Sequence, residues 1–426
     1  MISLWLVVAG MMITTSTHPT LHQYALNYTN LARKTSSFLN DNLKGVLPDG
    51  SFGGYYNATD SPGWSFCWSN FALLSADAEM VRLLSKSSVS PIAVEIEQHI
   101  SRMEIVVDWA RHYLWNTTTH NGGFFSAFLL SDPSGSDVTK FVDDLSYAGV
   151  AMLECFASLQ AIGLNNHSLS RKSLQYAAEC GDWLLQTNDS AIWSPDQGGY
   201  YWNTGEDARA QGIPINANAL AVILLQELAS VGDDVITSVT GKNFEGHAAL
   251  WTHQANITLD FLRSHALVSA LPRANGQLYR NYVPPKDIKS VIPQIFVYDN
   301  ALMVRALRTS HLDEDATALV KVIDKYFSLA EYGVYFESSL SGSVSTVFSG
   351  WAAEMLLSEN VSSSPLKTLE FVGVHLTDQE SGAVFQDAYP DGSHRRYGKG
   401  THFTLDCAYG LRYFARCANL ELQLHQ

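Results

Sequence analysis

The sequence predicts an all-α domain in which six helical hairpins form two concentric rings, an (α/α)6 barrel. Three observations predict this fold: a glycine–aromatic segment that recurs six times, about twelve helical stretches between the copies, and a regular alternation in the polarity of those stretches. A helix with one apolar face lies at a surface, whereas a helix that is apolar all round must be buried on every face. Alternation of the two kinds therefore indicates an outer ring of helices around an inner ring.

The recurring segment is a glycine followed by an aromatic pair or by a short aromatic-bearing strand. Its copies are spaced by roughly 50 to 80 residues, which suits a helical hairpin with a long loop better than the short repeat of a solenoid. The six copies are Gly53–Tyr56, Gly122–Phe125, Gly198–Tyr201, Gly276–Tyr279, Gly333–Phe336 and Gly382–Phe385.

The helices on either side of these segments differ in polarity. Residues 91–114 and 312–330, which precede a copy, carry charged side chains on one face, whereas residues 145–162 and 215–228, which follow a copy, are apolar nearly all round. Each loop should therefore lead from an outer helix into an inner one, so that all six share one rim with the inner-helix N-termini. Helix dipoles favour carboxylates at such a rim. Inner helices are expected to begin near Trp68–Asn70, Asp143–Asp144, Asn216–Asn218, Tyr298–Asn300, Phe348–Trp351 and Asp406–Cys407.

The ends of the chain predict export. Residues 1–17 contain about ten apolar residues followed by small polar ones, which is too short to span a bilayer and typical of a signal peptide. Residues 18–426 are expected to form a single (α/α)6-barrel domain, because no low-complexity linker interrupts them. Seven Asn-x-Ser/Thr sequons, at Asn27, Asn57, Asn116, Asn166, Asn188, Asn256 and Asn360, favour a glycosylated extracellular protein. We expect a secreted monomer with no membrane span.

The composition excludes several classes of function. A net charge of −15 disfavours a nucleic-acid partner, and 11% aromatic with only 16% charged residues suits a neutral polar ligand such as a sugar. No phosphate loop, dinucleotide fingerprint or Gly-x-Ser-x-Gly elbow occurs, and the five cysteines lack metal-site spacing, so neither cofactor nor metal is expected. One or two disulfides are plausible in an oxidising compartment.

The strongest candidate for chemistry is the pair Asp143-Asp144, which opens an otherwise apolar helix. Successive side chains on a helix diverge by about 100°, so the two cannot satisfy the same cap. Like charges this close should separate their pKa values, giving one ionised and one protonated carboxyl, as glycoside hydrolysis requires. The alternative is an N-cap and a dipole partner without chemistry. Asp299 and Asp406 have similar settings, and Glu206-Asp207 is either a pocket residue or a solvated loop.

Aromatic side chains near the rim are candidates for stacking against a sugar ring, although core packing is the alternative for each of them. These candidates are Trp64, Trp68, Tyr201, Trp202 and Trp351.

The order of these motifs resembles glycoside hydrolase family 76, the endo-α-1,6-mannanases and related fungal cell-wall proteins. The resemblance runs from Trp64–Asn70 through Asp143-Asp144 and Gly198–Trp202 to Tyr298–Asn300. It implies a retaining glycosidase on α-mannosidic, α-1,6-mannan-type linkages, with Asp143 and Asp144 as nucleophile and acid/base. It adds Tyr147, Asn218, Tyr298 and Asp299 to the substrate-binding candidates and carbohydrate as the partner. This chain has Tyr147 where family members commonly have tryptophan, and Asp299-Asn300-Ala301 where they commonly have Asn-Gln-Gly.

Two alternatives remain open. The same barrel serves sugar epimerases, which generally use histidine as acid and base, so a pocket containing His402 opposite another histidine would favour an isomerase. The other alternative is a non-catalytic glycan-binding or cell-wall-assembly protein on a glycosidase scaffold.

Overall fold

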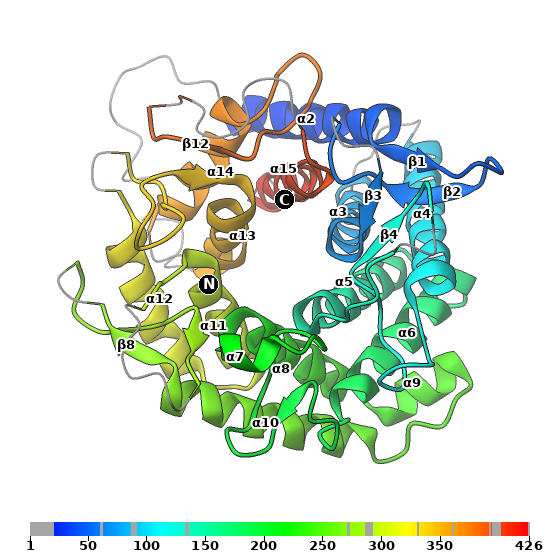
Figure 1. The fold of residues 1–426 in the computed structure, drawn as a ribbon. Coiled ribbons are helices and arrows are strands. Elements are labelled where there is room, and N and C mark those ends of the chain that lie inside the picture. The colour runs from blue at the N-terminus through cyan, green and yellow to red at the C-terminus, as the bar shows by residue number, and fades with distance from the viewer. Residues whose placement is uncertain are drawn as a thin grey trace.

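The structure is a double ring of helices, and the predicted all-α (α/α)6 barrel is confirmed (Figure 1). The computed structural model describes residues 21–59, 63–86, 92–132, 136–270, 273–285, 293–329, 332–359, 362–391, 393 and 402–424. The predicted signal peptide, residues 1–17, lies outside the described residues. The inner ring consists of α3 (Cys67–Ser85), α5 (Val142–Ala161), α8 (Ile215–Val231), α11 (Val297–Thr309), α13 (Trp351–Leu356) with the π-helical turn Thr346–Gly350 before it, and α15 (Thr404–Leu424).

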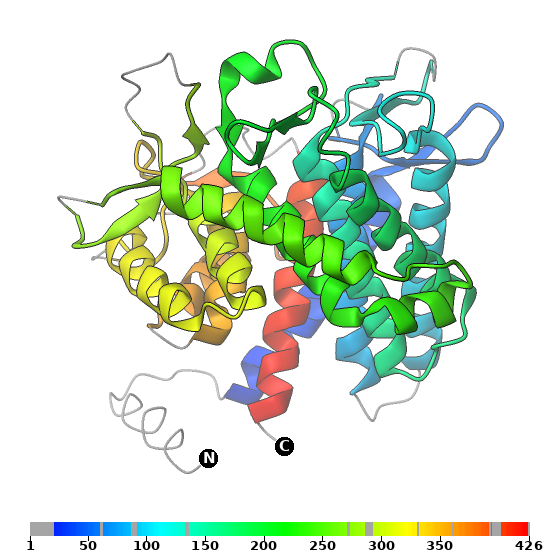
Figure 2. The ribbon, with the colours of Figure 1, turned by 90° about the horizontal axis from the view of Figure 1, so that it is seen from below.

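The outer ring consists of α2 (Leu21–Asn42), α4 (Ile92–Trp109), α6 (Ser168–Leu184), α10 (His247–His265), α12 (Asp313–Phe327) and α14 (Ser364–His375). Each of α4, α6, α10, α12 and α14 packs mainly on the inner helix that precedes it in the chain, and α2 packs on α15, so the first and last helices close the ring. Figure 2 shows α15, in red, extending to the end of the barrel opposite the loops, where α2 lies beside it. None of the described helices combines the length and apolarity that crossing a bilayer requires.

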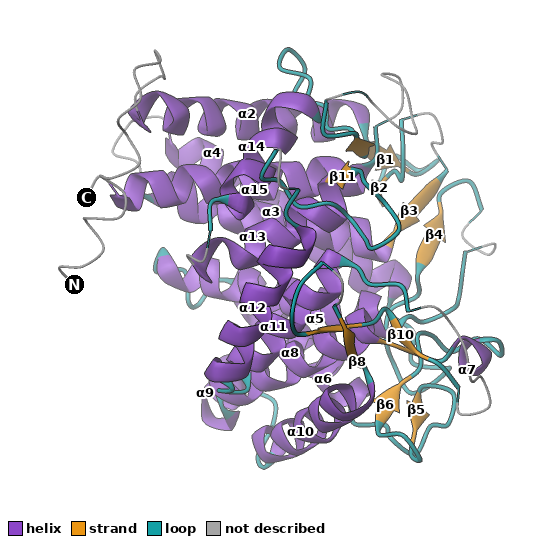
Figure 3. Cartoon of the chain, turned by 90° about the vertical axis from the view of Figure 1, so that its left-hand side faces the viewer, coloured by secondary structure: helices purple, strands orange, loops and turns teal. Residues whose placement is uncertain are grey.

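Short antiparallel sheets gather at one end of the barrel, where the predicted loops lie (Figure 3). Three sheets form within single loops, and three join one loop to the next. The first kind comprises β1 (Lys44–Val46) with β2 (Phe52–Tyr55), β5 (Trp193–Ser194) with β6 (Gly199–Tyr200), and β8 (Leu267–Ser269) with β9 (Gln277–Tyr279). The second comprises β3 (Trp64–Phe66) with β4 (Ala127–Leu129), β7 (Ile213–Pro214) with β10 (Tyr282–Val283), and β11 (Val344–Ser345) with β12 (Asp387–Ala388). The short helix α7 (Ala208–Gln211) lies in the third of these loops, whereas α9 (Asp233–Thr240) lies in the connection from α8 to α10 at the opposite end of the barrel.

The recurring glycine has a backbone reason. Every copy of the segment contains a glycine at positive φ, a region that side-chain-bearing residues rarely adopt. At Gly54, with φ of 87°, an added Cβ would also collide with Ser65 and the indole of Trp109. The repeat found in the sequence is therefore a turn requirement that six loops share.

A buried asparagine fixes three of the glycine–aromatic strands to the inner helices. It is the fourth residue of α3, α8 and α11, and its Oδ1 accepts the backbone N–H of the strand's tyrosine. The pairs are Asn70 with Tyr55, Asn218 with Tyr200 and Asn300 with Tyr279, at N···O distances of 2.9, 2.7 and 2.7 Å. Each amide also donates to backbone carbonyls, so a buried loop strand leaves few polar groups unpaired.

All five cysteines are buried in the helical core, and no disulfide joins any of them. The expectation of one or two disulfides is therefore wrong for this structure. A chain of this size buries enough apolar surface between its two rings to fold without cross-links.

Candidate active site

The second residue of every inner helix lines one pocket of about 440 Å³ at the loop end of the barrel. These residues are Trp68, Asp143, Asn216, Tyr298, Val347 and Leu405, where Val347 belongs to the π-helical turn before α13. Six helices that enter the barrel in the same orientation and phase turn equivalent positions toward its axis. The sequence of each inner helix start therefore decides what a ligand meets.

Asp143 is the carboxyl group that the second position of α5 brings into the pocket. Its side chain is buried, with 6% of the residue exposed. Its Oδ2 accepts hydrogen bonds from Trp202 Nε1 at 2.9 Å and from Asn216 Nδ2 at 3.2 Å, while its Oδ1 accepts the backbone N–H of Asp144 at 3.0 Å. Burial raises the pKa of Asp143 to about 6, and the hydrogen bonds from Trp202, Asp144 and Asn216 oppose this rise because they stabilise the anion.

Asp144, at the third position, turns away from Asp143 around the helix. It is not among the residues that line the pocket, and its carboxyl lies beside Ser126 and Asp137. Burial raises the pKa of Asp144 well above its usual range, and the negative charges of Asp143 and Asp137 raise it further. The two adjacent carboxyls therefore have different surroundings, and Asp144 holds its proton at a higher pH than Asp143 does.

Aromatic rings form the floor of the pocket. The ring of Trp68 stacks on Tyr147 with centroids 4.6 Å apart, and Trp351 meets both edge-on at 5.8 and 5.5 Å. Tyr298 stacks with Trp351 at 6.3 Å and lies 4.7 Å from Phe348. Trp68, Tyr298, Phe348 and Trp351 line the pocket, whereas Tyr147 is buried beneath Trp68. A neutral sugar ring has apolar faces that fit such a floor.

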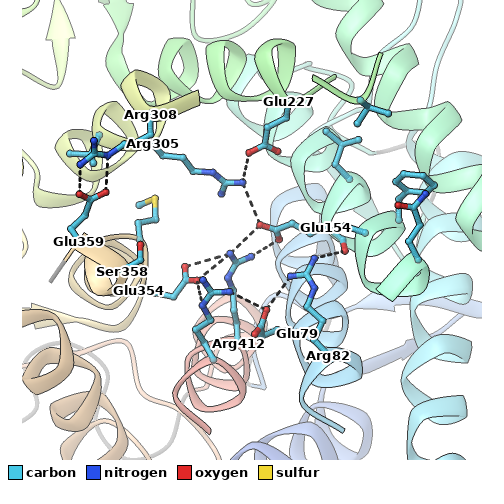
Figure 4. A pocket seen from close by; sticks show the side chains of 18 residues that line it. Glu79, Arg82, Glu154, Glu227, Arg305, Arg308, Glu354, Ser358, Glu359 and Arg412 are labelled. Carbon is cyan, nitrogen blue, oxygen red and sulfur yellow. Dashed lines mark hydrogen bonds and ion pairs between the residues drawn. The ribbon is translucent and has the colours of Figure 1, made fainter. Parts of the chain in front are cut away.

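Below this floor, the far end of the inner ring carries a network of five arginines and five glutamates around a second pocket of about 540 Å³ (Figure 4). Glu154 accepts from Arg412 at 2.6 Å and lies 3.6 Å from Arg305, which also pairs with Glu227 at 2.8 Å. The charges balance in number and pair across helices, so the network joins the helices at the end remote from the loops.

Two further aspartates occupy the third position of their helices. Asp406 on α15 lines the pocket, and burial followed by the charge of Asp387 raises its pKa to about 8. Asp299 on α11 is fully buried outside the pocket lining, and its Oδ2 accepts from Asn281 at 3.0 Å. Burial raises the pKa of Asp299 to about 8 as well.

Comparison with known proteins identifies the fold. No protein-family model and no curated protein matches the sequence of this chain. Among solved structures, a family 76 glycoside hydrolase, an α-mannanase from Bacteroides thetaiotaomicron, matches with a TM-score of 0.65 at 15% identity, over 94% of this chain and 97% of its own. A cellobiose 2-epimerase from Spirochaeta thermophila matches with 0.64 at 16% identity, over 97% and 100%.

A third structure is an inactive variant of an α-1,6-mannanase from a Salegentibacter species, in complex with α-1,6-mannotriose. Two consecutive aspartates are replaced by asparagine in it, and it matches with a TM-score of 0.58 at 13% identity, over 93% of this chain and 99% of its own. The chain has the six-hairpin glycosidase fold. Hydrolases and epimerases share this fold, so the pocket residues must distinguish between the two activities.

The six-hairpin fold brings some of the predicted site residues together and separates others. Asp143, Trp68, Trp202, Tyr298 and Trp351 line the pocket. Outside its lining lie Asp144, Tyr147, Asp299, Trp64, Tyr201 and Asn218. Trp64 sits in β3 opposite Leu129, and Tyr201 lies under the guanidinium of Arg209. The amide of Asn218 is fully used by the backbone of Tyr200 and Pro214, so the structure assigns this residue to the fold rather than to substrate.

Several residues that line the pocket were not predicted from the sequence. Asn57, Gln386 and Phe403 lie in loops and Ser345 lies in β11, and only their tertiary position reveals them. Asn216 had a detectable signal, because it occupies the same second position as Asp143.

The described lining residues include no histidine, lysine or arginine. His402 contacts Phe38, Phe385 and the Val384 carbonyl instead. Among the described residues no group of three or more metal-ligating side chains converges.

Proposed function

We propose that this protein is a glycoside hydrolase that cleaves α-mannosidic, α-1,6-mannan-type linkages by a retaining mechanism with two carboxyl groups. The observation that carries the proposal is Asp143, a buried carboxyl at the wall of an aromatic-floored pocket, with Asp144 beside it in the chain. The mannanase neighbour that binds α-1,6-mannotriose supports the choice of substrate, since its inactive form lacks two consecutive aspartates.

The surroundings of the two carboxyls suggest their roles. Trp202 and Asn216 direct N–H groups at Asp143 and stabilise its anion, so Asp143 attacks the anomeric carbon as nucleophile. Asp144 has the higher pKa and is the proposed acid. Because its carboxyl lies outside the pocket lining beside Ser126 and Asp137, this role requires the side chain to turn toward the leaving oxygen and donate its proton as that bond breaks. After the leaving group departs, the Asp144 carboxylate accepts a proton from water, which hydrolyses the glycosyl–Asp143 ester with net retention.

The test is hydrolysis of α-1,6-linked mannan oligosaccharides by wild type, Asp143→Asn and Asp144→Asn. Each substitution should lower kcat/KM on the order of 10³-fold or more, because each removes a group that acts in the transition state. Asp391→Asn is the matched control, since Asp391 is exposed and bonds only to Ser393 nearby. Proton NMR of the first product formed should show the α-anomer. Full activity of both asparagine variants, or a β-anomer formed first, would contradict the mechanism.

Sugar epimerisation is the alternative activity on this fold, and the same samples test it. A pocket without a described histidine favours hydrolysis, because epimerases generally use histidine as acid and base. Conversion of mannose or cellobiose to its 2-epimer, without release of shorter oligosaccharides, would replace the proposal. Binding without either reaction would favour the non-catalytic glycan-binding protein.

We also propose that the protein is secreted, glycosylated and monomeric. Exposed sequon asparagines at Asn166, Asn188 and Asn256 are compatible with attached glycans. Asn57 lines the pocket, where a glycan would occupy the space for substrate, so we expect this sequon to be unmodified in active protein. N-terminal sequencing of protein from the culture medium should begin near residues 17–20, and a start at Met1 would contradict the signal peptide.

A further inference from the structure

We propose that Asp406 and Gln386 form a subsite that binds a hydroxyl group of a neutral sugar, with the Asp406 carboxyl as hydrogen-bond donor and the Gln386 amide oxygen as acceptor. The proposal rests on the proposed function in that the ligand is a glycan. It assigns a binding role to the α15 side of the pocket, away from the reacting carboxyls on α5.

Asp406 lines the pocket from α15, whereas the reacting carboxyls lie on α5. Asp406 is the third residue of α15, and α3 with Trp68 separates it from the Asp143 wall around the inner ring. Only 2% of the residue is exposed, so its carboxyl faces the pocket rather than bulk solvent. A ligand seated on the aromatic floor would therefore contact Asp143 and Asp406 at different atoms.

The Asp406 carboxyl has no partner among the residues that the structure describes. No hydrogen bond or ion pair is made by its carboxyl among the described residues, and its Oδ1 is fully buried and unpaired. A buried polar group without a partner costs free energy of folding, which a bound ligand can recover. Asp299, at the same position of α11, also has an unpaired buried Oδ1, but its Oδ2 accepts from Asn281 and the residue lies outside the pocket lining.

The charge near Asp406 is negative. The charge of Asp387 in β12 acts on the Asp406 carboxyl, whereas Cys407 and Tyr413 on α15 are uncharged because burial holds their pKa values above the usual range. No described lysine or arginine lines the pocket. Burial and Asp387 together keep Asp406 protonated at neutral pH, and a protonated carboxyl has an O–H to donate.

Gln386 supplies a hydrogen-bond acceptor in the pocket that Asp406 lines. Gln386 lines the same pocket from the loop before β12, and its Oε1 is buried and unpaired. A sugar hydroxyl both accepts and donates a hydrogen bond, so the hydroxyl groups of a bound sugar match both the Asp406 donor and the Gln386 acceptor. The described part of the lining carries carboxyl groups and no lysine or arginine, which disfavours sugars that carry carboxylate, sulfate or phosphate.

The experiment measures binding of α-1,6-mannotriose at several pH values by quenching of tryptophan fluorescence, because Trp68, Trp202 and Trp351 line the pocket. It compares wild type with Asp406→Asn, Asp406→Leu, Gln386→Leu and the exposed control Asp391→Asn. Circular dichroism checks that each variant is folded, and Asp406→Asn keeps both shape and an N–H donor if the leucine variant fails to fold.

Wild-type affinity should fall as pH rises through about 8, where Asp406 loses its proton. Asp406→Leu and Gln386→Leu should each weaken binding about tenfold at pH 7, as expected for one lost hydrogen bond to ligand. Asp406→Asn should bind within a few-fold of wild type at pH 7 and lose the alkaline decline, which a merely structural role would not produce.

Leucine variants that fold and bind like wild type, or an unchanged alkaline decline in Asp406→Asn, would overturn the subsite. Binding with the expected pattern but without hydrolysis by wild type would overturn the proposed hydrolase and support the subsite. Tighter binding of an oligogalacturonate than of mannotriose would overturn the assignment to neutral sugars.

Discussion

Trp202 donates a 2.9 Å hydrogen bond from its indole Nε1 to Oδ2 of Asp143, although the two residues lie 59 positions apart in the chain. The bond joins the loop that precedes α8 to the start of α5, and it couples an aromatic rim residue to the candidate nucleophile. Since the donor stabilises the Asp143 anion, its removal should be visible in the pH dependence of the reaction.

Trp202→Phe should move the acidic limb of the kcat/KM profile to higher pH. Burial already raises the pKa of Asp143 to about 6, and the hydrogen bond from Trp202 holds it from rising further. Activity near pH 5.5 should fall about tenfold, because a hydrogen bond to a charged group contributes about 1.5 kcal/mol or more. Trp64→Phe is the matched control, since Trp64 lies outside the pocket lining. An unshifted limb in Trp202→Phe would contradict the coupling.

Asn216→Ala and Asn218→Ala should separate activity from stability within one helix turn. Asn218→Ala removes an amide bonded to Tyr200 and Pro214 and should cost about 3 kcal/mol of unfolding free energy, with little change in KM. Asn216→Ala removes a donor to Asp143 and should lower kcat/KM with a stability change below about 1 kcal/mol. Urea denaturation and steady-state kinetics measure the two effects. The reverse pattern would place Asn218, not Asn216, at the substrate.

Glu154→Gln should destabilise the base of the barrel. Burial alone would raise the pKa of Glu154, but the charges of Arg412 and Arg305 outweigh burial and hold it well below its usual range. Its stabilisation is therefore present above the unfolded pKa of about 4.5 and is lost as pH falls through the lower folded value. The substitution leaves Arg412 poorly paired and should cost about 3 to 5 kcal/mol at pH 7.

Urea denaturation of the Glu154→Gln variant and of wild type at pH 7 and pH 3 measures this difference, which should shrink at the lower pH. The exposed Glu206→Gln is the control, for which we expect no change at either pH. A Glu154→Gln protein as stable as wild type at pH 7 would contradict the role assigned to the network.

The thiols should be unreactive until the protein unfolds. All five cysteines are buried and outside disulfides, and burial raises the pKa of each of Cys67, Cys155, Cys180 and Cys407. A thiol reagent should therefore modify native protein slowly and modify all five cysteines in denaturant without reductant. Fewer than five reactive thiols in denaturant would indicate a disulfide that the structure does not contain.

The sequence by itself determined the two rings of helices. The spacing of apolar residues along each helix shows whether the helix is buried on one face or on all faces. The helix starts at Asp143, Asn216 and Tyr298 were predicted within a few residues. Each inner helix follows a loop with a glycine–aromatic segment, and that segment contains a glycine at positive φ. The pairing of Asp143 with Asp144 was also readable, because adjacent residues on a helix need no long-range information.

Only the tertiary structure decided which residues face the pocket. The phase with which α5 enters the barrel turns Asp143 inward and Asp144 toward Asp137, and a rotation of about 100° between neighbours separates their environments. Asn216 and Asn218 are the same residue type two positions apart in one helix. Asn216 donates a hydrogen bond to Asp143, whereas Asn218 bonds to the backbone of Tyr200 in β6. Gln386 and Asp406 line the same pocket because the sixth loop and the last helix, α15, complete the ring of helices. No pattern within a single segment of the sequence predicts this contact between the two ends of the chain.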